Sequence, residues 1–261
     1  MEQQQTWRRE LPNYKQVAPE IEDLPFQAKE AINVLRGNIQ LSGANLKVIA
    51  ITSAVTNEGK SSIAFRLTKS LAGLKKRTLY LDCDIRNSVT MSRYGMSGQV
   101  QGLTEYLCGA AAMNDIVYRT PDKYMDVILT GAVAPNPSEL VSGKLFTLLL
   151  DEMRKRYDYI IVDTPPINPV IDGTMIAKRC DGTVMVIESG QTDRMQAVRA
   201  KRQLEYAGIK LLGAVLNKVG AAKKGYGYGY GYGYGYGYGY GYGEKNQKRS
   251  GKKADKKEAK D

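Results

Sequence analysis

The sequence predicts an α/β protein whose doubly wound, mostly parallel sheet is covered by helices on both faces. Short apolar runs alternate with amphipathic segments from about residue 26 to residue 220. Such alternation is typical of strand–helix–strand units with a parallel sheet. Two of the runs, 47–52 and 158–162, are apolar on nearly consecutive residues. That pattern indicates strands buried on both faces, as in the middle of a parallel sheet.

The order of the expected elements follows from the same patterns. A helix over 26–41 precedes the first strand. Strands are expected at 47–52, 77–81, 126–130, 158–162, 182–187 and 210–216, and helices at 61–74, 137–156, 171–179 and 193–207. Roughly 195 residues suffice for one hydrophobic core of this kind. We therefore predict an N-terminal arm (1–25), one domain (26–220) and a flexible tail (221–261).

The composition changes abruptly after Val219. Residues 225–243 alternate strictly between glycine and tyrosine, and a lysine-rich end follows. A segment that is half glycine and has no aliphatic residue cannot form a packed core. Residues 221–261 hold ten basic and four acidic residues, so +6 of the net charge of +11 lies there. The tail is either a solvated, solubilising end or a segment attracted to anionic lipid or nucleic acid.

Composition also excludes whole classes of chemistry. The chain has no histidine, which rules out Ser-His-Asp and Cys-His catalysis and every zinc site that contains histidine. The three cysteines, Cys83, Cys108 and Cys180, are too far apart for CxxC chemistry and suit a reducing cytosol. No signal peptide or membrane-spanning run is apparent. We expect a cytoplasmic protein that is peripheral to the membrane at most.

A phosphate-binding loop is predicted between the first strand and the next helix. Residues 54–61 read AVTNEGKS, which matches the pattern GxxxxGK[ST] except that Ala54 replaces the first glycine. In such loops backbone N–H groups bind phosphate oxygens, the lysine reaches the β- and γ-phosphates, and the hydroxyl binds Mg²⁺. Ala54 fits if its φ is negative.

Three acidic residues stand at predicted strand ends. Asp163 ends the run YIIVD, and Asp82 and Asp84 end the second predicted strand. Because ligands bind at the carboxyl edge of doubly wound sheets, these carboxylates are expected beside the phosphate loop. A spacing of two places Asp82 and Asp84 on one side of an extended chain, where they repel unless a cation lies between them or one acts as a base.

Together these motifs resemble the bacterial tyrosine kinases of capsular and exopolysaccharide synthesis, in their cytosolic single-domain form. The resemblance rests on SAVTNEGKSS (53–62), LYLDCDIR (79–86), IIVDTPP (160–166) and the tyrosine-rich end. The stretches GAVAPNPSEL (131–140) and GAVLNK (213–218) are similar as well. A nucleotide-binding domain of the P-loop NTPase type is thereby implied.

The resemblance implies ATP and Mg²⁺ as cofactors and a role for each matched residue. Lys60, Asp82, Asp84 and Asp163 would be catalytic, with Asp82 accepting the proton of the tyrosine hydroxyl. Ser61, Asp84 and Asp163 would hold the metal. The nucleotide would be bound by Thr56, Asn57, Glu58, Gly59, Lys60, Ser61, Ser62 and Asn217, with Asn217 contacting adenine.

The phosphate acceptors implied by the resemblance are the tail tyrosines. They occupy alternate positions: Tyr226, Tyr228, Tyr230, Tyr232, Tyr234, Tyr236, Tyr238, Tyr240 and Tyr242. The glycines between them leave each hydroxyl free to enter an active site. The alternative is that the Gly-Tyr segment is a low-complexity, self-associating segment.

Partners are implied as well. The family's oligomerisation signature, Glu-x-x-Arg-x-x-Arg, here reads from Glu30 to Arg36, with Asn33 at the place of the first arginine. A homo-oligomeric ring with contacts at Glu30 and Arg36 is expected. A membrane adaptor of the polysaccharide chain-length type would hold the kinase at the inner face of the membrane, and a cognate tyrosine phosphatase would reverse the reaction.

The main alternative is a partitioning-type switch ATPase that binds nucleic acid or membrane through the basic, aromatic tail. Such ATPases carry a second lysine directly after the first position of the loop, where this chain has Val55. We therefore do not expect nucleic acid as a partner. A non-catalytic nucleotide binder, suggested by Ala54, is disfavoured because Lys60 and the acidic strand ends are all present.

Overall fold

The computed structural model of the chain describes residues 15–20, 22–96 and 100–220. The proposed phosphate acceptors, Tyr226 to Tyr242, and the rest of the predicted tail lie outside the described residues.

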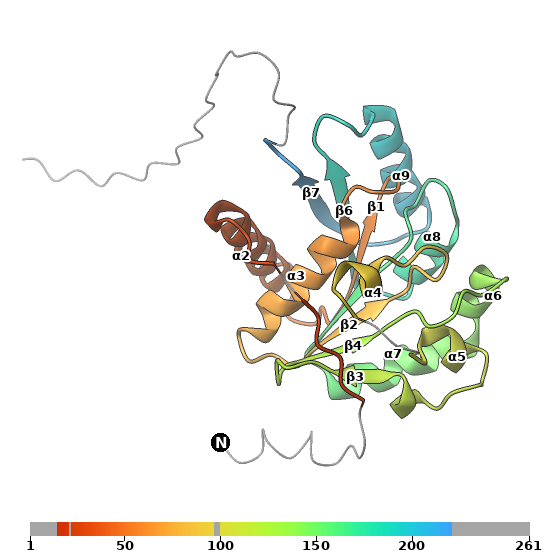
Figure 1. The fold of residues 1–261 in the computed structure, drawn as a ribbon. Helices are drawn as coiled ribbons and strands as arrows, with labels where there is room; N and C mark the ends of the chain where they lie inside the picture. Colours follow the sequence, from red (N-terminus) through yellow and green to blue (C-terminus); the bar gives the residue numbers. More distant parts are fainter. Residues whose placement is uncertain (1–14, 21, 97–99, 221–261) are drawn as a thin grey trace, which may run out of the picture. The chain divides into compact units, whose positions relative to one another are not determined.

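Within the described residues a seven-stranded sheet forms the centre of the domain (Figure 1). Its order is β3-β4-β2-β5-β1-β6-β7. The strands are β1 (Val48–Ser53), β2 (Thr78–Asp82), β3 (Val117–Arg119), β4 (Met125–Ile128), β5 (Tyr159–Asp163), β6 (Gly182–Glu188) and β7 (Leu211–Asn217). All neighbours pair in parallel except β3 and β4, which are antiparallel. The predicted mostly parallel sheet is confirmed.

Helices cover both faces of the sheet (Figure 1). On one face, α2 (Phe26–Leu41) and α3 (Lys60–Ala72) pack apolar side chains such as Ile39 and Phe65 against β1, β2 and β5. On the other face lie α7 (Lys144–Arg156), α8 (Asp172–Ala177) and α9 (Arg194–Tyr206). Successive residues of β1 join different clusters, so this strand is buried on both faces, as its apolar run predicts.

The helix predicted over 137–156 is wrong in one respect, because it is two helices. Gly143 is extended, with φ −68° and ψ 165°, and it separates α6 (Pro137–Ser142) from α7. The apolar periodicity runs on through the glycine, so the pattern alone does not show the break. The structure also contains elements that the sequence analysis did not predict: β3, α4 (Thr90–Arg93), α5 (Leu103–Leu107) and the 3₁₀ turn η2 (Met113–Asp115). Each has at most five residues, too few for a periodic signal.

The residues just before α2 also contact the domain. Val17 N donates to Arg119 O at 3.0 Å, and Arg119 N donates to Lys15 O at 3.0 Å, so this segment lies along β3. Glu20 N donates to the carbonyl oxygen of Tyr94 at 2.9 Å. Residues 15–20 thus protect the edge strand β3 from pairing with other chains. No helix in the part of the chain that the structure describes is long and apolar enough to cross a bilayer.

Candidate active site

The candidate site lies where β1, β2 and β5 end, at the carboxyl edge of the sheet. Residues 54–59 leave β1 and lead directly into α3, which begins at Lys60. Asp82 of β2 lies beside Asp163 of β5 in the parallel register, and Asp163 pairs on its other side with Ile51 of β1. The register therefore brings together carboxylates that are about 80 residues apart in sequence.

The loop has the conformation of a phosphate-binding loop. Asn57 and Gly59 have positive φ angles of 65° and 92°, and Ala54 is not among the described non-glycine residues with positive φ. Ala54 therefore takes the place of the first loop glycine without backbone strain. A Cβ at Gly59 would lie 2.2 Å from Asn217 Nδ2, so glycine is required there.

The backbone N–H groups of the loop are available to a ligand. Within the described structure, the N–H groups of residues 56–62 donate no hydrogen bond to protein, and α3 has no side-chain N-cap. Consecutive unpaired N–H groups at a helix N-terminus form an anion-binding nest, which the helix dipole strengthens. The loop can therefore hold phosphate groups.

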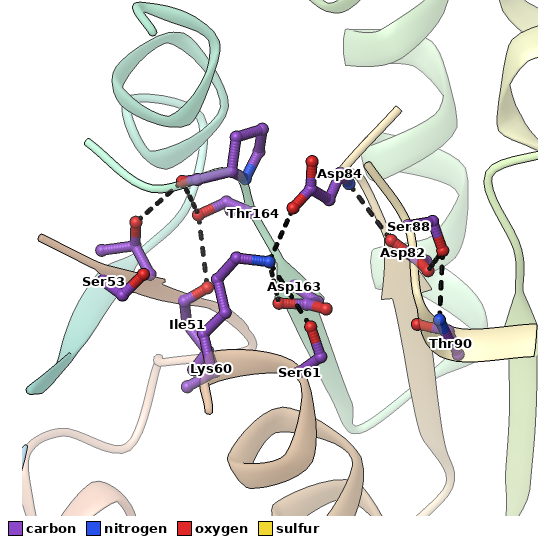
Figure 2. Close-up of polar contacts among 12 residues, drawn as sticks. Ile51, Ser53, Lys60, Ser61, Asp82, Asp84, Ser88, Thr90, Asp163 and Thr164 are labelled. Carbon is purple, nitrogen blue, oxygen red and sulfur yellow. Dashed lines mark hydrogen bonds and ion pairs between the residues drawn. The ribbon is translucent and has the colours of Figure 1, made fainter. Parts of the chain in front are cut away.

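Lys60 lies among the carboxylates in front of this loop (Figure 2). Its Nζ donates to Asp84 Oδ2 at 2.7 Å and lies 3.6 Å from Asp163 Oδ1 and 3.4 Å from Ser61 Oγ. These four residues are buried. The carboxylates of Asp163 and Asp84 outweigh the burial of the ammonium group and raise the pKa of Lys60. Lys60 therefore stays charged.

Asp82 is held in one orientation on the far side of Asp84. Ser88 Oγ donates to Asp82 Oδ2 at 2.6 Å, and Asp84 N donates to Asp82 Oδ1 at 3.1 Å (Figure 2). Burial, reinforced by the charge of Asp163, raises the pKa of Asp82 to about 6. A carboxyl group with this pKa can exchange a proton near neutral pH, as a general base requires.

Asp163 has an unsatisfied oxygen that faces Lys60. Tyr80 Oη donates to Asp163 Oδ2 at 3.0 Å, whereas Oδ1 is buried and accepts no hydrogen bond. Burial raises the pKa of Asp163, and the Lys60 charge opposes that shift. A buried carboxylate oxygen without a hydrogen bond is a suitable ligand for a cation or for its bound water.

The described residues do not build a complete metal site by themselves. Among the described residues no group of three or more acidic, histidine or cysteine side chains is placed to hold an ion. Mg²⁺ in phosphate-transferring sites is usually bound by one or two carboxylates together with the phosphates and water. The residues present, Ser61 with Asp84 and Asp163, fit that mode.

A cavity of about 1220 Å³ is lined by Lys60, Ser61 and Asp84 of this cluster. Asp82 and Asp163 are fully buried and do not line it. The residues around it include the loop from Thr56 to Ser62, Asp84, the prolines after β5, the end of β7 and the exposed side of α2. Of the predicted nucleotide ligands, Glu58 has its side chain elsewhere, because its carboxylate accepts hydrogen bonds from the protein. Asn217 Nδ2 donates to the carbonyl oxygen of Glu58 at 2.9 Å, so this side chain holds the loop.

Sequence reasoning missed supporting residues that have no motif of their own. Tyr80 and Ser88 position Asp163 and Asp82. Arg86 lines the cavity, and its Nε donates at 2.5 Å to Asp172, a buried residue at the start of α8. Tyr80 and Arg86 lie within the segment LYLDCDIR, which was a signal for this neighbourhood but not for the contacts.

The other predicted site residues lie on α2. Asn33 Nδ2 donates to Glu30 Oε1 at 2.9 Å, and Arg36 Nη1 donates to Ser70 Oγ at 2.8 Å on α3. Arg36 thus joins α2 to α3 within the chain, whereas Glu30 is exposed. Side chains exposed on α2 include Phe26, Val34 and Leu41.

The fold and the site define a nucleotide-binding domain of the P-loop NTPase type. A family model described as an AAA domain matches residues 46–192. The tyrosine-protein kinase CpsD of Streptococcus agalactiae is 41% identical over 201 residues, which cover 77% of this chain and 88% of that protein. The chain belongs to the bacterial tyrosine-protein kinases, and the predicted resemblance is confirmed.

Solved structures agree with this assignment. The kinase domain of the Escherichia coli tyrosine kinase ETK superposes with a TM-score of 0.71 at 26% identity, covering 86% of this chain and 98% of that one. The septum site-determining protein MinD from Pyrococcus horikoshii, complexed with Mg-ADP, gives a TM-score of 0.59 at 20% identity, covering 68% and 72%. The similarity to MinD shows the fold alone.

Proposed function

We propose that this kinase binds Mg-ATP at the loop 54–61 and transfers the γ-phosphoryl group to tyrosines of its own C-terminal cluster, 226–242. The observation that carries the proposal is the unpaired row of N–H groups at 56–62, set directly against a buried lysine and three carboxylates. That arrangement supplies donors for phosphate, a place for the metal and a base in one site.

Nucleotide binding assigns a role to each group in the cluster. The N–H groups and Lys60 hold the phosphates, and Lys60 exchanges its contact with Asp84 for the phosphate oxygens. Asp84 is then free to serve the metal with Ser61 and Asp163. A Mg²⁺ ion held by these residues would neutralise charge on the β- and γ-phosphates. Exchange of one ionic partner for another keeps the buried charges paired throughout.

Asp82 is the proposed base. In the reaction the tyrosine oxygen attacks the γ-phosphorus, ADP leaves, and the phenolic proton passes to Asp82. Ser88 and the Asp84 N–H fix the direction of its carboxylate. Because the transition state of phosphoryl transfer is loose, positioning of the hydroxyl is expected to matter as much as basicity.

The tail suits the role of acceptor on chemical grounds. Its nine tyrosines alternate with glycine, so no neighbouring side chain obstructs entry of a hydroxyl into the cavity. A glycine-rich chain of about 20 residues has an r.m.s. span of roughly 25 Å, enough to reach a neighbouring subunit. Transfer between subunits is therefore favoured by the proposed oligomer.

Partners follow from the family and from α2. We infer a homo-oligomeric ring that uses the exposed side of α2, where Glu30 is exposed and Phe26 and Val34 are 75% and 60% exposed. Arg36 takes part only by exchanging its bond to Ser70. A membrane adaptor of the chain-length type holds the kinase at the membrane, a cognate phosphatase resets the tail, and the output is capsular or exopolysaccharide synthesis.

Two chains with complementary defects test the proposal. The first, with Lys60→Met, keeps its tail but loses the phosphate-binding lysine, and the second keeps Lys60 but has phenylalanine at all nine tail tyrosines. We expect neither to become phosphorylated alone with Mg-ATP. In a mixture, the Lys60→Met chain should gain phosphate. Wild-type phosphorylation without any transfer in the mixture would contradict transfer between subunits.

A switch ATPase remains the competing function, because the basic tail is interleaved with aromatic residues. It predicts ATP hydrolysis without phosphotyrosine and salt-sensitive binding of the tail to single-stranded nucleic acid. Measuring nucleic-acid binding by the wild type and by a chain that ends at residue 220 separates the two functions.

A further inference from the structure

Residues at the ends of β6 and β7, and in the segments that follow these strands, hold the phosphate loop in place through hydrogen bonds. Glu58 is the centre of these contacts and is 1% exposed. Its Oε2 accepts a hydrogen bond from Val55 N at 2.7 Å within the loop. Its Oε1 accepts hydrogen bonds from Glu188 N at 3.3 Å and from Thr192 Oγ1. One buried carboxylate thus closes the loop on itself and ties it to the end of β6.

Lys218 holds the loop at a second point. Its Nζ donates to the carbonyl oxygen of Asn57 at 2.9 Å and to Glu188 Oε2 at 2.7 Å. Lys218 and Asn57 also have positive φ angles, 58° and 65°, in a described chain where Lys75 is the one other non-glycine example. Left-handed conformations at such residues cost free energy and persist where contacts on all sides fix them. Here the two strained residues are joined by a hydrogen bond.

We propose that Glu58, Glu188 and Lys218 are positioning residues that orient the N–H groups of the phosphate loop toward the nucleotide. This inference rests on the proposed nucleotide binding and concerns side chains that bind the loop or one another.

Peptide geometry explains how the orientation arises. A trans peptide is planar, so its N–H group points opposite to its carbonyl group. Lys218 binds the carbonyl oxygen of Asn57 and thereby fixes the direction of the Glu58 N–H. Asn217 binds the carbonyl oxygen of Glu58 and fixes the direction of the Gly59 N–H. Both N–H groups belong to the unpaired row in the loop.

The arrangement also explains how Asn57, which is not a glycine, keeps a left-handed conformation in the loop. Asn57 is held in a left-handed conformation by contacts at its own carbonyl group and through Glu58. Preorganised donors bind an anion without reorganisation on binding, so loss of a fastening lowers affinity even though no ligand contact is deleted.

The affinity for Mg-ADP, measured by calorimetry, tests the inference without requiring turnover. We expect Lys218→Met to weaken binding about tenfold, the size expected for one charge-assisted hydrogen bond. Glu188→Gln should have a smaller effect, since Lys218 keeps its bond to Asn57. Lys218→Arg should recover most of the affinity. Lys201→Met, which removes the exposed pair with Glu205 on α9, is the matched control and should bind as the wild type does.

Amide hydrogen exchange separates positioning from general stability. In Lys218→Met, exchange should increase within residues 54–61 and stay unchanged in β1 and β5, at a temperature well below the melting point. Glu58→Gln, which cannot accept all three hydrogen bonds, should show the same localised increase. Wild-type affinity and exchange in both variants would overturn the inference. A wild type that does not bind Mg-ADP would instead overturn the proposed function.

Discussion

At the residue scale, Asp82 is the group whose protonation matters most for the proposed chemistry. Its pKa is raised to about 6 by burial, with Asp163 adding to the shift. Phosphotransfer should therefore increase about tenfold per pH unit below pH 6 and level off above it, because only the deprotonated base acts. Initial rates of phosphotyrosine formation between pH 5 and pH 8 measure this.

Asp82→Asn provides the control for that profile. The variant should bind Mg-ADP as the wild type does and form no phosphotyrosine at any pH. Residual transfer with an unchanged pH profile would show that another group sets the profile and that Asp82 is not the base.

The same shift makes a prediction about stability. Because the pKa of Asp82 is higher in the folded state than its ordinary value of 3.8, the folded chain binds more protons between about pH 4 and pH 6. Deprotonation of Asp82 therefore lowers the free energy of unfolding as the pH rises through that range, and this cost is complete above pH 6. Asp82→Asn removes the cost, so its gain in melting temperature over the wild type should grow from pH 4 to pH 7. A gain that shrinks with rising pH would contradict the assignment.

At the scale of elements, close backbone approaches hold the site's loops in place. Gly173 in α8 is one such contact, since a Cβ there would lie 2.5 Å from the carbonyl oxygen of Pro165. Pro165 belongs to residues 164–166, which follow Asp163 directly. We expect Gly173→Ala to displace residues 164–166, to lower the melting temperature and to weaken Mg-ADP binding.

The control is Gly37→Ala in α2, where a Cβ would meet nothing within 4 Å. Replacing a helical glycine by alanine typically stabilises a helix by ~0.5–1 kcal/mol. The melting temperature of this variant should be equal to or above that of the wild type. Equal behaviour of the two variants would show that the α8 contact does not support the site.

Helices and strands could be predicted from the sequence where the hydrophobic pattern is long, and were missed where the element depends on tertiary contacts. The apolar runs of β1 and β5 and the periodicity of α2 and α3 are strong local signals. The edge strand β3 has three residues and exists because it pairs with β4 and with Gln16. No local pattern encodes such pairing.

The residues of the candidate site divide in the same way, into those that lie in recognisable motifs and those that only tertiary contacts bring together. The loop, Lys60 and the three aspartates could be predicted because their spacing along the chain is a recognisable motif, and the register of parallel strands brings them together. The contacts of Glu58 with Thr192 and of Lys218 with Asn57 join residues more than 130 positions apart. They depend on the pairing of β6 with β1 and of β7 with β6, and they could not be read from the sequence.

At the scale of the whole molecule, we predict that the charge of the tail couples its phosphorylation to assembly. Residues 221–261 carry a net charge of +6. Each phosphate adds ~1.5–2 negative charges at pH 7, so phosphorylation of all nine tyrosines would change the tail from +6 to roughly −8 to −12. Fully phosphorylated chains should therefore dissociate from one another through repulsion between tails.

Sedimentation velocity of phosphorylated and unmodified protein at low and high salt measures this effect. The difference in oligomeric state should be large at about 50 mM salt and small at about 500 mM, since salt screens repulsion. The chain with nine phenylalanines should remain assembled with Mg-ATP at both concentrations. Dissociation that is indifferent to salt would point to a change in the subunit contacts instead of charge repulsion.

We propose that the buried cluster around Lys60 phosphorylates the chain's own tyrosine tail. Intact mass spectrometry of the wild type, incubated with Mg-ATP and the cytosolic end of a chain-length adaptor, tests it most directly. We expect a ladder of added phosphates that maps to Tyr226–Tyr242 and is absent from Lys60→Met. ATP hydrolysis with no phosphate on the tail would contradict it.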